Sequence, residues 1–279
     1  MIYSARCEDD LGAGVKYPRA MLQNALTLDN VRAAFRAKGY AFFDLGDYNL
    51  NVFGVRRANT QSDRFDDFLG AIYKDAQRRW RIKIWPATTD PGRYWLERPQ
   101  NPSGTAILVP GQYRQAYGVG KHQGKYTALC QVRPVQVWRD NNLDNIVDYG
   151  PRSGPVHTGV FGINIHRTNP YGESYLVGRW SAGCQVFRRA ADFDALMRLV
   201  RISSRSFGER FTYTLFSESD FIRRDRSLTA WRDARIRAAD AALTSALDRT
   251  RATGRAIDRA GLEDLAVMVN RTYPGEDDS

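Results

Sequence analysis

The segment Trp80-Arg-Ile-Lys-Ile-Trp85 alternates large apolar and basic side chains, and Pro86 follows it directly. Alternation with a period of two is typical of a strand with one buried face. A proline cannot donate the hydrogen bond that would continue a sheet. We therefore expect a β-strand over residues 80–85 that stops at Pro86.

Further short apolar runs precede and follow this segment. They cover residues 48–56, 105–109, 128–132, 135–138, 160–165 and 211–216, with turn-forming Pro and Gly residues between several of them. Several short strands at this spacing favour a sandwich or barrel over alternating strand–helix units.

Two helices accompany the predicted strands. The first begins at a capping residue, Thr27 or Asp29, and ends at Gly39. The second covers residues 189–206, where apolar side chains recur at helical spacing. The predicted fold class is therefore α+β.

The length of 279 residues suits one full-sized domain with appendages. We expect a mixed α/β segment over residues 1–75, packed on a β-rich catalytic domain over 76–218. Residues 219–279 are rich in Ala, Arg, Asp and Leu, and they predict a helical appendage through which two copies of the chain can associate.

The chain carries 41 Lys and Arg against 31 Asp and Glu, a net charge of +10. Residues 219–279 hold eleven of each sign, so the excess lies in residues 1–218. A basic protein favours an anionic partner: nucleic acid, a membrane face or the bacterial wall. No zinc-finger spacing or single-strand-binding aromatic motif points to specific nucleic-acid recognition. With 43% hydrophobic residues the chain can bury a core, and no apolar run is long enough to span a membrane.

Two stretches carry the residues suited to chemistry. The first, Phe161-Gly-Ile-Asn-Ile-His166, ends in an imidazole, and the second is Ser181-Ala-Gly-Cys184. A nearby imidazole is the usual means of activating a thiol nucleophile. Gly183 lets the backbone bend so that N–H groups face an oxyanion, and Ser181 can hold the turn or the imidazole. The alternative is that Cys184 is a small buried apolar residue.

The residues just before this turn suit a peptide substrate. Arg179 is a candidate partner for a carboxylate, and Trp180 for the apolar part of a peptide stem. A structural role for Trp180 remains open. No organic cofactor and no metal is implied by this set of residues.

His166, fourteen intervening residues and Ser181-Ala-Gly-Cys184 resemble the catalytic signature of the L,D-transpeptidases, the YkuD-like family. The resemblance implies Cys184 as nucleophile, His166 as its base and the Gly183–Cys184 backbone as part of an oxyanion hole. It also implies a β-rich catalytic domain whose substrate is the peptide stem of peptidoglycan. It covers residues 160–187 closely and 80–216 loosely.

Two positions depart from the family pattern. Ala182 stands where the motif has a second His, and Val186 stands where it has Arg or Asn. The nucleophile and base are kept, whereas leaving-group handling and carboxylate recognition differ from the family.

The opening residues lack a Sec signal peptide, so we expect synthesis in the cytoplasm and action in the periplasm or cell wall after release or delivery. This favours a hydrolytic enzyme of the phage endolysin or secreted effector kind, which degrades the wall through an acyl-enzyme. One alternative is a true L,D-transpeptidase that exchanges or crosslinks stems. Another is a basic nucleic-acid-binding or virion structural protein.

The segment from Asp140 to Asp148 spaces oxygen ligands as some calcium loops do, but Asn145 and Pro151 replace the glycine and the acidic residue of such a loop. A plain turn is the preferred interpretation, and calcium binding is the alternative.

The remaining candidates have simpler interpretations. We expect His157 in an exposed loop, His122 in a solvated turn, and Cys7 and Cys130 to be inert. The segment from Thr88 to Arg93 contains Asp-Pro-Gly and is interpreted as a turn.

Overall fold

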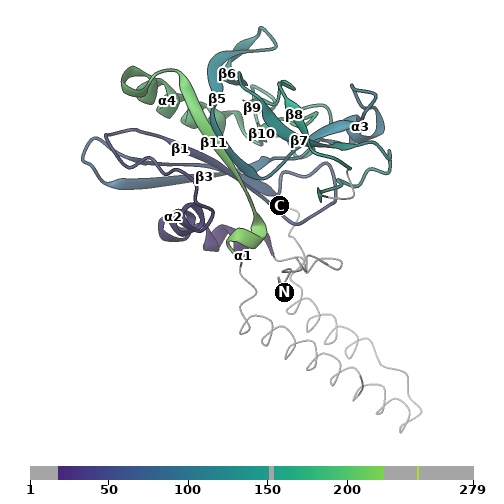
Figure 1. The fold of residues 1–279 in the computed structure, drawn as a ribbon, viewed down its shortest axis with the longest axis horizontal. Helices are drawn as coiled ribbons and strands as arrows, with labels where there is room; N and C mark the ends of the chain where they lie inside the picture. Colours follow the sequence, from purple (N-terminus) through teal and green to yellow (C-terminus); the bar gives the residue numbers. More distant parts are fainter. Residues whose placement is uncertain (1–17, 151–153, 223–243, 245–279) are drawn as a thin grey trace, which may run out of the picture. The chain divides into compact units, whose positions relative to one another are not determined.

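The computed structural model describes residues 18–150, 154–222 and 244 (Figure 1). The elements in chain order are α1 (Arg19–Ala25), α2 (Leu28–Ala37), β1 (Asn51–Arg56), β2 (Asp67–Lys74), β3 (Trp80–Thr88), α3 (Arg93–Glu97), β4 (Thr105–Leu108), β5 (Gly111–His122), β6 (Tyr126–Gln131), β7 (Val135–Asp140), β8 (His157–Gly159), β9 (Ile165–Arg167), β10 (Gln185–Phe187), α4 (Ala190–Phe207), β11 (Arg210–Ser217) and the short helix η2 (Glu218–Asp220).

Eight strands close into a barrel in the order β1-β11-β5-β6-β9-β10-β3-β2. Strand β1 runs parallel to β11 and β9 runs parallel to β10, whereas the other barrel pairs are antiparallel. Strands β4, β7 and β8 form a separate antiparallel sheet. The expected α+β class is confirmed, and of the two expected architectures the chain adopts the barrel.

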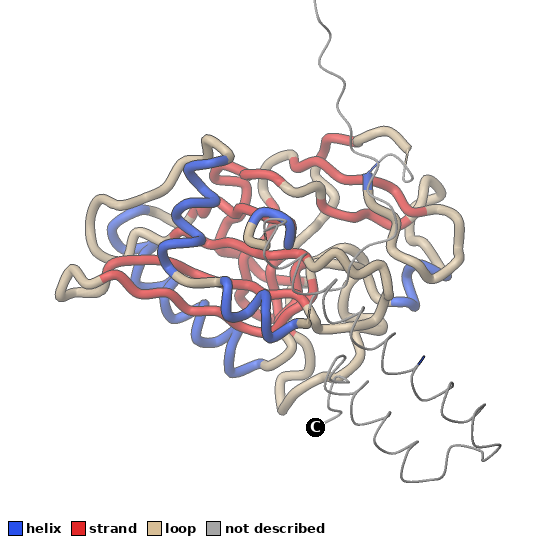
Figure 2. Tube along the Cα trace, turned by 90° about the horizontal axis from the view of Figure 1, so that it is seen from below, coloured by secondary structure: helices blue, strands red, loops and turns tan. Residues whose placement is uncertain are grey.

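Helices cover the barrel strands on two sides. Figure 1 shows α1 and α2 on one side of β1 and β3, with α4 on the other, and Figure 2 shows the strands gathered at the centre. Phe193 of α4 packs edge-on against Phe187 of β10, and Phe35 of α2 packs edge-on against Phe216 of β11. Burying each such side chain stabilises the fold by roughly 1.5–3 kcal/mol.

Both expected helices are present. The hydroxyl of Thr27 accepts a hydrogen bond from the Asn30 N–H at 3.2 Å, which caps α2. Gly39 follows that helix with a φ of +66°, the left-handed conformation that commonly ends helices. The helix expected over residues 189–206 is α4, shifted by one residue.

The expectation that a strand stops at Pro86 is wrong, because β3 continues to Thr88. Strand β2 pairs with β3 through Pro86 and Ala87. The Pro86 carbonyl accepts a hydrogen bond from the Arg188 N–H at 3.2 Å, on the side away from β2. Strand β10 joins that side only at Ala87 and Thr88, so the missing N–H of the proline interrupts no pairing.

The strand expected over residues 160–165 is also wrong. Strand β8 ends at Gly159 and β9 begins at Ile165, the last residue of the expected range, and residues 160–164 between them are irregular. The side-chain oxygen of Gln131 accepts hydrogen bonds from the N–H groups of Phe161 and Ile163, each at 3.0 Å. These amides are therefore satisfied without a neighbouring strand, and Gly162 turns the chain with a φ of +76°.

Strands β2 and β5 have no counterpart among the expected strands. Nearly all of β2 is buried on both faces, so its sequence shows no alternation. Strand β1 lies between β2 and β11, and the expected boundary after residue 75 falls in the hairpin between β2 and β3. Residues 51–74 are therefore part of the barrel rather than a segment packed on it.

Within the described residues, none of the helices has the length and apolar character required to cross a membrane. The described chain runs through η2 to Ile222, and the expected C-terminal helices lie outside the described residues apart from Thr244.

Candidate active site

The turn before Cys184 is built from a buried serine and a glycine. The Ser181 hydroxyl donates to the Cys184 carbonyl at 2.8 Å and accepts from the Gly183 N–H at 3.2 Å. Gly183 has a φ of +115°, and a Cβ there would lie 2.3 Å from the Ala106 carbonyl oxygen. Only glycine fits this position, because both the conformation and the contact exclude a side chain.

The Cys184 sulfur lies between two backbone groups of the irregular segment that precedes β9. It accepts a hydrogen bond from the Asn164 N–H at 3.4 Å, and its S–H donates to the Gly162 carbonyl at 3.5 Å. Burial raises the pKa of the thiol to about 11, against a smaller lowering by the Asn164 N–H. Cys184 is therefore a neutral thiol at pH 7.

The His166 ring, only 2% exposed, projects from β9. Its Nδ1 lies 2.9 Å from the Arg167 carbonyl oxygen, which can only accept, so Nδ1 carries the ring proton. The other nitrogen, Nε2, is buried, and no hydrogen bond from it is found among the described residues. Burial, followed by the nearby His122 ring, lowers the pKa of His166 to about 3, although the Trp180 backbone acts on the ring to raise its pKa slightly. The ring is thus neutral, with a lone pair at Nε2.

Strand pairing places the thiol and the imidazole on one face. In the parallel pair, His166 lies opposite Val186, and Cys184 stands two residues before Val186. Cys184 itself precedes β10, and its side chain packs against the cluster that contains Val186, on the side to which the paired His166 points. Among the described residues, the hydrogen bonds of the two side chains go to other partners, and none joins Cys184 to His166.

The two expected oxyanion donors are not equivalent. The Gly183 N–H is already bound to the Ser181 hydroxyl, whereas no hydrogen bond of the Cys184 N–H is found within the described part of the chain. Of the Gly183–Cys184 backbone, expected to form part of an oxyanion hole, the Cys184 N–H is therefore the group available to bind an oxyanion.

Arg179 and Trp180 flank the turn but are held differently. The Arg179 guanidinium lies over the Tyr94 ring of α3 at 4.0 Å, and its carbonyl accepts from the Trp95 indole N–H at 3.1 Å. Trp180 is 41% exposed. The arginine is thus fixed on an aromatic ring with its charge available, while the indole faces solvent.

The interpretation of His122 as a solvated turn residue is wrong. The side chain is 7% exposed, and its ring stacks on His166 with centroids 3.9 Å apart. Tyr126, also absent from the expected site, donates its O–H to the Arg167 carbonyl at 3.2 Å. Neither residue lies near His166 in sequence. Their place at the site could be predicted only from the pairing of β5 with β6.

The remaining His and Cys residues stand apart from this arrangement. His157 is exposed, as expected, although it lies in β8 rather than in a loop. Cys130 is half-buried in β6, and burial raises the pKa of its thiol. Cys7 lies outside the described residues.

The segment from Thr88 to Arg93 is more than a surface turn. Thr89 is fully buried. Its backbone N–H donates a hydrogen bond to the Asp67 carboxylate at 2.7 Å, and its hydroxyl donates a second one at 2.8 Å. The Gln185 amide donates to the Thr89 carbonyl at 3.4 Å. This segment therefore supports the first residue of β10 from inside the barrel.

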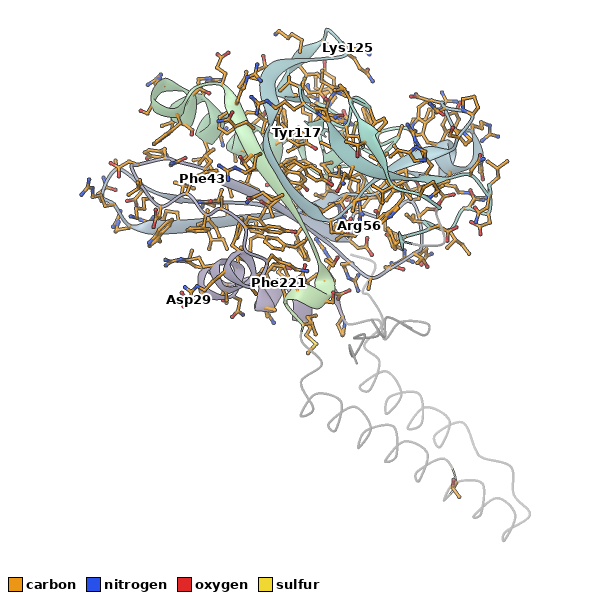
Figure 3. All side chains as sticks on the ribbon, in the orientation of Figure 1. Asp29, Phe43, Arg56, Tyr117, Lys125 and Phe221 are labelled. Atoms are coloured by element: carbon orange, nitrogen blue, oxygen red, sulfur yellow. The ribbon has the colours of Figure 1, made fainter. Side chains whose placement is uncertain are left out.

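A buried ion pair anchors the same segment. Arg56 and Asp90 meet at 2.8 Å, and the second oxygen of Asp90 accepts the Tyr149 O–H at 2.7 Å. The guanidinium of Arg56, labelled in Figure 3, also donates to the Leu108 carbonyl at 2.6 Å. With these hydrogen bonds the charges are compensated, so the cluster holds β1, β4 and the 88–93 segment together.

In the segment from Asp140 to Asp148, the oxygens are engaged by the chain itself. The Asn142 amide donates to Asp144 at 3.0 Å and to Asp148 at 2.8 Å. The Asp148 N–H donates to Asp140 at 3.0 Å. Among the described residues, no group of three or more His, Cys, Asp or Glu is arranged to hold a metal ion. The hydrogen bonds agree with the preferred interpretation as a turn.

No family model, curated protein or solved structure matches the chain.

Proposed function

We propose that the protein is a cysteine acyltransferase of peptidoglycan stem peptides that hydrolyses its acyl-enzyme. The observation that carries the proposal is the state of His166. Its Nδ1–H is fixed by the Arg167 carbonyl, and its buried Nε2 carries a lone pair on the face to which the Cys184 side chain packs. This is the arrangement that a general base for a thiol requires.

The pKa values of Cys184 and His166 determine when the thiol proton moves to the imidazole. The pKa of the thiol is raised to about 11 and that of His166 is lowered to about 3, so a resting thiolate–imidazolium pair is strongly disfavoured. The thiol proton therefore moves to Nε2 only as the sulfur attacks a carbonyl carbon. The sulfur first has to rotate away from the Gly162 carbonyl, its partner in the resting site.

The remaining steps follow from the same groups. Attack gives a tetrahedral intermediate whose oxyanion is bound by the Cys184 N–H. The C–N bond then breaks, and the imidazolium of His166 gives its Nε2 proton to the leaving amine. Water attacks the resulting thioester with His166 as base, which releases the carboxylate and restores the thiol.

Two features support the wall as substrate. The first is the resemblance of the His166 and Ser181–Cys184 spacing to the L,D-transpeptidases. The second is the net charge of +10, which favours association with anionic polymers. Arg179 and Trp180 supply a cation and an exposed aromatic ring for a peptide carboxylate and stem. We place the action of the enzyme at the wall, after release or delivery.

The test is incubation of purified sacculi with the full chain, followed by mass spectrometry of the muropeptides. We expect cleaved stems with the wild type and with Cys130→Ala, a matched change at another half-buried thiol, and none with Cys184→Ala. Unchanged muropeptides with the wild type would refute the proposal.

The same experiment separates the two outcomes for the acyl-enzyme. In H₂¹⁸O, hydrolysis places one heavy oxygen in each new carboxylate. With an added acceptor amine, a transpeptidase would instead give products that carry the amine and no heavy oxygen.

A further inference from the structure

His122 ends β5 and lies at the base of the β5–β6 hairpin, whose turn carries Lys125 (Figure 3). Its ring is nearly parallel to that of His166, with an angle of 18° and centroids 3.9 Å apart. Two stacked aromatic rings restrict each other's rotation. The plane of the candidate base is thus set by a residue from a distant part of the chain.

The protonation state of His122 follows from Asn164. The Asn164 side-chain oxygen accepts the Gln131 backbone N–H at 2.9 Å, and a backbone N–H can only donate. The other side of the Asn164 amide, its NH₂ group, therefore faces His122 Nδ1 at 3.0 Å. His122 Nδ1 must be a lone-pair acceptor, so the ring is neutral with its proton on Nε2.

Asn164 connects this ring to the nucleophile. Its side chain donates to His122, and its backbone N–H donates to the Cys184 sulfur at 3.4 Å. His122 thus contacts the base directly by stacking and the nucleophile indirectly through one intervening residue. These contacts suit a group that holds both reacting side chains in place.

We propose that His122 is a positioning residue for the nucleophilic pair: its neutral ring fixes the plane of His166 and, through Asn164, the position of the Cys184 sulfur. The inference rests on the proposed function of this pair. It adds a role for a residue outside the motif that suggested that function.

The role requires His122 to stay neutral. A proton on Nδ1 would face the NH₂ group of Asn164, donor against donor, and would place a charge beside His166. The titratable groups around the ring are Lys125 in the turn, Tyr126 on β6 and His166 on β9. Burial and then the Lys125 charge lower the pKa of His122. Protonation of His122 by acid would therefore disturb the site through this ring.

The first test reads the tautomers directly. The chain has three His residues, so ¹⁵N-labelled rings can be assigned with single variants. At pH 7.5 we expect the proton of His122 on Nε2 and that of His166 on Nδ1 in the wild type. Replacement His122→Ala, which removes the stacked ring, is expected to free the His166 ring to turn and to give mixed tautomers of His166, whereas His157→Ala, a matched change at an exposed ring, is expected to leave them unchanged. A wild-type His122 protonated on Nδ1 would overturn the proposal.

The second test follows alkylation of Cys184 by chloroacetamide from pH 5 to pH 9, with the site identified by mass spectrometry. The wild-type rate is expected to fall more steeply than tenfold per pH unit on the acid side, once His122 takes up a proton. His122→Phe keeps a ring but removes the acceptor, so its profile should lose that extra fall and its rate at pH 7 should drop on the order of tenfold. His122→Ala should behave in the same way.

Identical profiles for the wild type and both His122 variants would contradict the proposal, and melting curves check that each variant is folded. If the variants do not fold, the wild-type tautomers decide the question alone. Neither readout uses a wall substrate. Failure of the proposed function would appear as unchanged muropeptides, and failure of this inference as a wild-type His122 protonated on Nδ1 or as identical alkylation profiles.

Discussion

At the scale of single residues, the Cys184 thiol is held as a neutral group by burial. The pKa of about 11 means that the thiolate fraction rises tenfold for each pH unit until that value is approached. A pre-formed ion pair with His166 would instead give a constant thiolate population near neutral pH. The two possibilities differ in measurable reactivity.

We expect the rate of Cys184 alkylation by iodoacetamide to rise about tenfold per pH unit between pH 7 and pH 10, without a plateau, because the rate follows the thiolate fraction. Peptide mapping distinguishes this site from Cys130. A plateau between pH 6 and pH 8 would show that the thiol is ionised by the imidazole and that burial does not dominate.

Gly183 is a second residue whose role is open to test. In Gly183→Ala the new methyl would meet the Ala106 carbonyl at a positive φ, so we expect a loss of roughly 1–3 kcal/mol in the free energy of unfolding from the strained backbone alone. Denaturant titration measures it. Gly172→Ala is the control, since a Cβ there meets nothing within 4 Å, and it should change little. Equal stability of the two variants would contradict the prediction.

At the scale of elements, the strands that carry the site are too short to be recognised from sequence. Strands β9 and β10 have three residues each, and they pair because the chain returns after a long irregular loop. The residues preceding β9 look like a strand, yet the Gln131 side chain takes up their N–H groups. A local sequence pattern cannot show that a side chain, rather than a neighbouring strand, accepts the hydrogen bonds of these N–H groups.

The proximity of the motif residues to one another can be predicted from the sequence, whereas their contacts with more distant parts of the chain cannot. Ser181, Gly183 and Cys184 form one turn, so their local spacing already predicts their proximity. The contact of His122 with His166 depends on the register of the β5–β6 hairpin. Strand β5 was not expected from the sequence, so its last residue could not be placed. The missing information is long-range pairing rather than residue chemistry.

The end of β7 offers a prediction at this scale. Burial raises the pKa of Asp140 to about 6, and the charges of Asp148 and Asp144 add to this effect. Between the usual Asp value and pH 6 the folded state holds a proton that the unfolded state has lost, so stability falls as pH rises through this window. Asp140→Asn mimics the protonated form and can still accept the Asp148 N–H.

We therefore expect Asp140→Asn to be more stable than the wild type by about 1–2 kcal/mol at pH 7.5 and equal to it at pH 4. Thermal melting at both pH values measures the difference. A stabilising effect of calcium on the wild type alone, with Asp140→Asn less stable at pH 7.5, would contradict this prediction and favour the calcium alternative.

At the scale of the whole molecule, the net charge of +10 lies in residues 1–218, which include the whole barrel, because residues 219–279 carry eleven basic and eleven acidic groups. Under the proposed function, charge carried with the candidate catalytic residues would raise the local concentration of an anionic substrate around them. Exposed charges act through solvent, so this attraction is screened at high ionic strength. Electrostatic interactions within a buried site are screened much less.

The two contributions can be separated with Cys184→Ala, which removes the proposed nucleophile and keeps the charge. We expect the fraction of this variant bound to purified sacculi to fall several-fold between 50 mM and 500 mM salt, because the Debye length drops below roughly 5 Å at the higher value. Cosedimentation measures the bound fraction, and sacculi with amidated carboxyl groups are the control that should bind weakly at both salt concentrations. Binding that is independent of salt would mean that specific contacts near Arg179 and Trp180, rather than overall charge, hold the protein to the wall.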